Sequence, residues 1–160
     1  MGKVILFKRG EERMEDILEV AKYFLSRGMM NHKKLQKLCY YSQALYAALY
    51  NTKLMDTEFE AWVHGPVSPR LYSRYRDWGG LCITGLQSIP HFVDGSHRIF
   101  LDKIYDLYGG YTADELEKMT HEESPWKEAR GNLAGDVPCK NIIPYESMAR
   151  YYRGMLGVGG

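Results

Sequence analysis

The spacing of apolar residues predicts helices over most of the chain. Between Met14 and Arg27 apolar residues recur at helical spacing, and Gly28 follows at the position of a helix C-cap. A longer helix is expected from Asn31, a capping residue, to about Tyr50. Its apolar stripe has the spacing of one buried face and consists of Leu35, Leu38, Ser42, Leu45 and Leu49, with Cys39 and Tyr46 beside it. Both segments therefore predict an amphipathic helix.

Start signals predict further helices in the rest of the chain. Serine–proline pairs at 68–69 and 124–125 each place a capping hydroxyl before a proline at the first helical position. A capping box formed by Thr112 and Glu115 opens another helix. The helices expected here are 69–75, 98–108, 112–119, 125–129 and 144–153.

Strand signals are few. Residues 58–63, EFEAWV, alternate well enough for a short extended segment, and the loop-like segment 79–97 has room for one short strand within 83–93. The predicted fold is therefore mainly α: a compact single-domain helical bundle of about seven short helices with at most a minor short β pairing. The expected organisation is an N-terminal extension at 1–13, the domain at 14–155 and a flexible tail at 156–160.

Composition and charge narrow the class of protein. A chain of 160 residues is most simply one domain. Its 21 basic and 20 acidic residues give a net charge of +1, so nucleic acid is not an expected partner. The three cysteines have no C-x-x-C spacing and indicate free thiols in a reducing cytosol. No apolar run is long enough for a membrane span, and we expect a cytoplasmic protein without a cofactor.

The stretch AWVHGPVSP, residues 61–69, interrupts the helical pattern. Gly65 and Pro66 are expected to turn the chain, with Trp62 and His64 holding the corner. A catalytic histidine needs an orienting carboxylate and a substrate proton within hydrogen-bond reach. No serine or cysteine nucleophile motif accompanies His64 in the sequence. We therefore expect a structural or interface histidine.

The stretch THEES, residues 120–124, places His121 beside Glu122 and Glu123. Adjacent ligands on one helix point in different directions, whereas a metal site needs three or four converging groups. We therefore expect a solvated helix end and no metal. Catalysis by His64 or His121, in a phage-borne hydrolase or a nucleotide-handling enzyme, remains the alternative function.

The long helix and the corner after it form the expected partner-binding surface. The chain has 13 tyrosines, and exposed tyrosines give a large contact area with few rotors to freeze. The lysines at the start of the helix would act on the association rate with an acidic partner. A solvated lysine face and core-packed tyrosines are the alternative interpretation. The expected contact residues are Lys33, Lys34, Lys37, Tyr40, Tyr41, Trp62, His64, Gly65, Pro66 and Val67.

Three blocks of the sequence resemble a known family. They are KLQKLCYYSQALYAALY (34–50), FEAWVHGPVSPRLYSRY (59–75) and THEESPW (120–126). In this order and spacing they are similar to the Panacea domain, a family that includes SocA-like antitoxins and phage-associated proteins of the GepA type. The likeness runs from about Met14 to Tyr152.

This resemblance implies a mainly helical domain that neutralises a cognate toxin by direct contact. Toxins paired with the family are chemically diverse, and one SocA-like member is an adaptor that delivers its toxin to the ClpXP protease. Prophages and other mobile elements are the common setting. The resemblance supplies no catalytic residue, so it implies a binding module rather than an enzyme.

Overall fold

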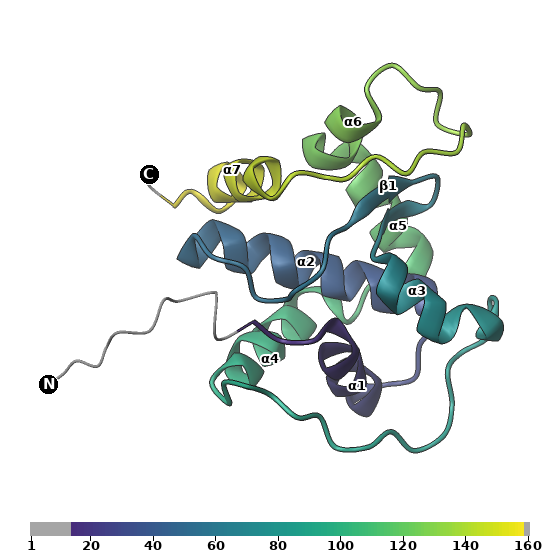
Figure 1. Cartoon of the computed structure of the whole chain (residues 1–160), viewed down its shortest axis with the longest axis vertical. Coiled ribbons are helices and arrows are strands. Elements are labelled where there is room, and N and C mark those ends of the chain that lie inside the picture. The colour runs from purple at the N-terminus through teal and green to yellow at the C-terminus, as the bar shows by residue number, and fades with distance from the viewer. Residues whose placement is uncertain (1–13, 159–160) are drawn as a thin grey trace, which may run out of the picture.

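The computed structural model describes residues 14–158 and is mainly α (Figure 1). This range contains seven α-helices: α1 (Ile17–Arg27), α2 (His32–Tyr50), α3 (Pro69–Tyr75), α4 (His97–Tyr108), α5 (Ala113–Glu122), α6 (Ser124–Arg130) and α7 (Tyr145–Leu156). A short 3-10 helix, η2 (Arg76–Trp78), follows α3. The two strands are β1 (Glu60–Trp62) and β2 (Gly65–Val67). The predicted fold class is confirmed.

Two expected terminal segments fall at the limits of this range. The N-terminal extension at 1–13 and residues 159–160 of the tail lie outside the described residues. The tail was expected from residue 156, but α7 continues through Leu156 and ends at Gly157, which adopts the left-handed conformation of a helix C-cap.

The capping residues in the sequence explain most helix starts. The side chain of Asn31 accepts a hydrogen bond from the amide of Lys34, and the capping box of Thr112 and Glu115 opens α5. Ser68 caps α3 before its proline, as expected. The matching expectation for Ser124 is wrong, because Ser124 is already the first residue of α6 and makes no side-chain cap bond.

The long helix α2 lies at the centre of the molecule (Figure 1). Helices α1, α3, α4, α5 and α7 and strand β2 all contact it. Thirteen of its 19 residues are buried, which is far more than one face. The apolar stripe expected from the sequence therefore covers too little of the helix surface. It also extends too far toward the C-terminus, because Leu49, near the end of the helix, is 44% exposed.

The two strands form an antiparallel hairpin whose tip is Val63 and His64. The chain therefore reverses two residues before the expected turn at Gly65 and Pro66, which pair with β1 as part of β2. A later segment extends this pairing, because the amide of Ala61 donates to the carbonyl of Asn141 at 2.8 Å. The strand allowed for within 83–93 is absent from the described residues, where this stretch is irregular.

Candidate functional site

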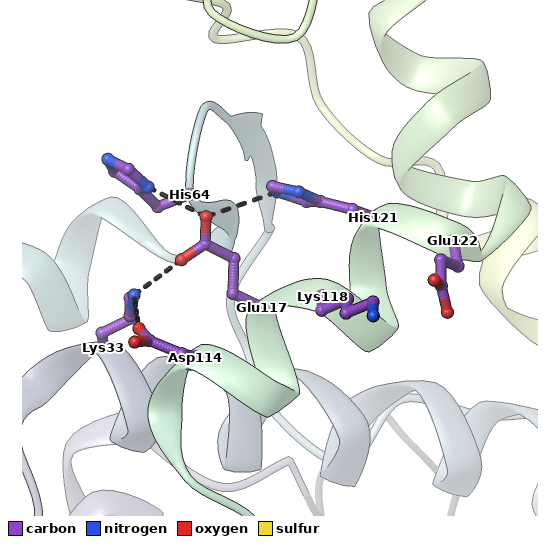
Figure 2. Close-up of a pocket in the computed structure, with 7 residues that line it drawn as sticks. All are labelled: Lys33, His64, Asp114, Glu117, Lys118, His121 and Glu122. Carbon is purple, nitrogen blue, oxygen red and sulfur yellow. Dashed lines mark hydrogen bonds and ion pairs between the residues drawn. The ribbon is translucent and has the colours of Figure 1, made fainter.

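A charged pocket lies between the start of α2, the hairpin tip and α5 (Figure 2). Its volume is about 560 Å³. Glu117 occupies its centre, one turn into α5, and its side chain is 18% exposed. One carboxylate oxygen accepts a hydrogen bond from the Lys33 ammonium at 2.6 Å, and the same ammonium lies 2.6 Å from Asp114. Burial raises the pKa of Glu117, but the hydrogen bonds from Lys33 and His64 outweigh it, and the pKa lies below its usual value.

Both histidines considered for catalysis face the other oxygen of Glu117 (Figure 2). His64 Nδ1 lies 3.0 Å from that oxygen and His121 Nε2 lies 3.9 Å from it. The His64 side chain is 72% exposed, so it does not hold the corner by packing. His121 instead stacks on Trp126 with ring centroids 4.0 Å apart, and burial lowers its pKa. The expectation of a solvated helix end is therefore wrong for His121.

Lys37 is enclosed behind the hairpin. Its ammonium donates a hydrogen bond to the carbonyl of Pro66 at 3.3 Å, and the side chain is fully buried. Burial lowers its pKa to about 7, although nearby Glu117 acts in the opposite direction. The expectation that Lys37 shares a solvent-facing stripe with Lys33 is wrong. Lys34 also folds back, because its ammonium donates to the carbonyl of Gly109 at 2.7 Å.

An apolar groove adjoins the hairpin tip. Its volume is about 210 Å³, and it separates the hairpin from the loop between α6 and α7. His64 lines this groove as well as the charged pocket, so the tip joins the two cavities. The residues that line the groove are Trp62, Val63, His64, Val67, Pro138, Cys139 and Lys140.

The two walls of the groove are joined by Arg130, which is 3% exposed at the end of α6. One guanidinium nitrogen donates to the carbonyl of Ala61 in β1 at 2.9 Å. The other donates to the carbonyls of Ala134 and Val137 in the loop, at 2.7 and 2.5 Å. Charge-assisted hydrogen bonds of this kind are stronger than neutral ones. Arg130 therefore fixes the loop relative to the hairpin.

Tyr40 and Tyr41 do not form an exposed surface, and that expectation is wrong. Both side chains are completely buried. The Tyr41 hydroxyl donates to Glu123 at 2.8 Å, and the Tyr152 hydroxyl donates to the same oxygen at 2.6 Å. The Tyr41 ring also stacks on Tyr108 at 4.2 Å between centroids. Buried tyrosines normally find a hydrogen-bond partner, and here Glu123 supplies one.

The structure therefore divides the expected contact residues. It brings together Lys33, Trp62, His64 and Val67 around the two cavities. It encloses the remaining residues of the set or turns them inward, namely Lys34, Lys37, Tyr40, Tyr41, Gly65 and Pro66. Sequence reasoning missed the residues that complete the site from later segments, which are Glu117, Arg130, Pro138, Cys139 and Lys140.

Within residues 14–158 no three His, Cys, Asp or Glu side chains are arranged to hold a metal ion. None of the helices in this range has the length and apolar character needed to span a bilayer.

The fold defines a mainly α domain built around one buried helix and a short hairpin. A family model for the antitoxin SocA-like Panacea domain matches residues 35–127, which is more than half of the chain. The protein belongs to this antitoxin-like family, as its sequence blocks predicted. No curated protein and no solved structure matches the chain. Membership of this family implies a toxin as partner and suggests a role other than catalysis.

Proposed function

We propose that this protein neutralises a cognate toxin by binding it directly. The observation that carries the proposal is the match of residues 35–127 to the SocA-like antitoxin family. Delivery of the bound toxin to a ClpXP-type protease and an origin in a prophage or another mobile element belong to the same proposal. A cytoplasmic location accords with the absence of paired cysteines, since Cys39, Cys82 and Cys139 are all free thiols.

The contact surface in this proposal is the hairpin tip with its two cavities. Four of the residues expected from the sequence surround it, and the tip side chain of His64 is exposed. The hairpin is fixed from both sides, by Lys37 bonded to Pro66 and by Arg130 bonded to Ala61. A rigid scaffold under an exposed loop suits recognition, because little conformational freedom is lost on binding.

The proposal is tested by co-expression with the reading frame that adjoins this gene in its genome. We expect expression of that neighbour alone to stop growth and co-expression to restore it. A tagged form of this protein should then retain the neighbour's product in a pull-down. A neighbour whose toxicity is unaffected by this protein would contradict the proposal.

Enzymatic activity at His64 is the second candidate, because Glu117 provides the orienting carboxylate that the sequence alone did not reveal. If His64 only contacts the partner, His64→Gln, which keeps hydrogen-bonding capacity, should retain toxin binding far better than His64→Ala. The measurement is the dissociation constant for the toxin, together with the growth assay. Loss of growth protection in both variants, with toxin binding and folding intact, would favour catalysis.

A further inference from the structure

We propose that the apolar groove takes a short acidic segment of the partner that inserts one large apolar side chain. This inference rests on the proposed function, since it specifies which part of a toxin the hairpin face would hold. It follows from three properties of the groove: its lining and size, its rigidity, and the sign of the charge at its edge.

The lining and size of the groove select an apolar side chain. Trp62, Val63 and Val67 form one wall and Pro138 with Cys139 forms the other. Its volume of about 210 Å³ is smaller than the roughly 300–1,000 Å³ of typical small-molecule pockets. The groove therefore has room for one side chain from a protein partner, in the manner of a binding hot spot.

The groove is already formed in the free protein. Arg130 bonds both walls, and the amide of Ile143 donates to the carbonyl of Phe59 at 2.8 Å where the loop returns to the hairpin. A groove held in this way loses little entropy when a partner enters it, which favours binding by a short segment.

The charge at the edge of the groove selects an acidic partner. Apart from His64, Lys140 is its one charged lining residue, and no carboxylate lines it. Lys140 is exposed, and its side chain makes no ion pair or hydrogen bond within residues 14–158. On the other side of the tip, Glu117 is already bonded to Lys33 and His64, while Lys118 on the pocket wall has no acidic partner within residues 14–158.

Acidic groups beside the inserted side chain would therefore meet Lys140, whereas the Lys118 side chain points away from His64, toward Glu122 (Figure 2). Glu122 is the acidic residue of the pocket that has no ion pair within the described chain, and its side chain points away from His64 (Figure 2). It therefore does not oppose an acidic segment at the groove.

The test uses three capped tripeptides with the ¹⁵N-labelled full-length protein, followed by NMR titration. The probes are acetyl-Glu-Leu-Glu-amide, acetyl-Lys-Leu-Lys-amide and acetyl-Glu-Ala-Glu-amide. We expect the first to shift the amide signals of residues 62–65, 67 and 139–140, and to bind about fivefold or more tightly than the other two. Equal binding of the acidic and basic leucine peptides, shifts confined to other residues, or no binding would each overturn the inference.

A charge-reversal pair sharpens the test. Lys140→Glu should abolish the preference for the acidic leucine peptide, whereas Lys103→Glu on α4, another exposed lysine, should leave it unchanged. Because the exposed Lys140 side chain makes no ion pair or hydrogen bond within the described residues, the variant should give a native spectrum. If peptide selectivity is found but the toxin is not neutralised, the proposed function fails alone. If neutralisation holds but the peptides do not discriminate, this inference fails alone.

Discussion

Lys37 is fully buried, although lysine side chains are ordinarily exposed to solvent. Its ammonium has one protein acceptor, the carbonyl of Pro66, and its side chain is sealed behind Gly65. In the folded protein its pKa is lowered to about 7, against 10.5 in an exposed lysine. Between pH 7 and about 10 the unfolded chain therefore binds more protons than the folded protein, and stability rises with pH in this window.

We expect Lys37→Met to stabilise the protein, and to do so most below pH 7, where the wild-type side chain is charged in its buried site. The lowered pKa corresponds to roughly 5 kcal/mol, which the methionine variant avoids. The gain in free energy of unfolding should shrink as the pH rises from 7 to 10. Urea titrations at pH 6, 8 and 10 measure it, with Lys127→Met as the exposed control. A gain independent of pH would show that Lys37 keeps the same protonation state in the folded and unfolded chain, so that its pKa is not lowered by burial.

Tyr40 and Tyr41 show which properties of a single residue can be predicted from the sequence and which cannot. Between Leu38 and Tyr50 the helix has no charged residue, and a helix that is apolar on all sides is usually buried. That signal favoured the core over an exposed aromatic surface. The hydroxyl partner of Tyr41, however, is Glu123, more than 80 residues away, and no local pattern indicates it.

At the scale of elements, helices were predictable because their signals are local. Periodicity and caps placed α2, α3 and α5 within a few residues of their observed ends. Only the first strand of the hairpin was predicted from the sequence, because Gly65 and Pro66 of the second strand are residues typical of a turn. Gly65 instead adopts a φ of +108° within β2, with the Lys37 side chain packed against it.

Gly65→Ala is expected to destabilise the protein by about 2 to 4 kcal/mol. A Cβ atom there would lie 2.5 Å from Lys37 Cε and 3.0 Å from Thr120 Oγ1, in addition to the cost of the positive φ. Gly85 is the matched control, because its φ is +98° and a Cβ would meet nothing within 4 Å. Gly85→Ala should therefore cost only about 1 kcal/mol. Thermal unfolding of both variants measures the difference, and equal losses would mean that the steric contact is relieved without cost.

At the scale of the whole molecule, Glu15 joins three distant segments. Its backbone pairs with Leu54 and Asp56, while its side chain accepts hydrogen bonds from the amides of Val93 and Asp94. The same carboxylate lies 2.6 Å from His97 Nδ1, and it is almost fully buried. This single side chain therefore fixes the end of the long irregular segment before α4.

Glu15→Ala should lower the free energy of unfolding by about 3 kcal/mol or more, because it removes the buried carboxylate that binds the amides of Val93 and Asp94 and the buried imidazole of His97. Glu19→Ala provides the comparison, since Glu19 accepts from one loop amide, that of His91, and from the Lys22 ammonium, and its side chain is 19% exposed rather than fully buried. We expect that variant to lose about 1 kcal/mol. Chemical denaturation of both proteins measures the two values, and a similar small loss in each would contradict this role of Glu15.

The candidate site was predictable only where it is continuous in sequence. The stretch from Trp62 to Val67 was expected at the contact surface and forms most of the hairpin, and Lys33, also expected there, lines the pocket. The other half of the site comes from α5 and from the loop before α7. Only tertiary packing brings Glu117 and Lys140 to the hairpin, so their role has no local signature.

The two walls of the apolar groove come from segments far apart in the sequence, and this has a consequence for protein synthesis. Pro138 and its neighbours are translated about 70 residues after Val67, so a ribosome at about 5 to 20 residues per second needs roughly 4 to 14 seconds to supply the second wall. During that interval the nascent chain contains the residues of only one wall of the groove. Messages truncated before codon 138 would therefore yield polypeptides that lack this binding face, whatever helices they have formed.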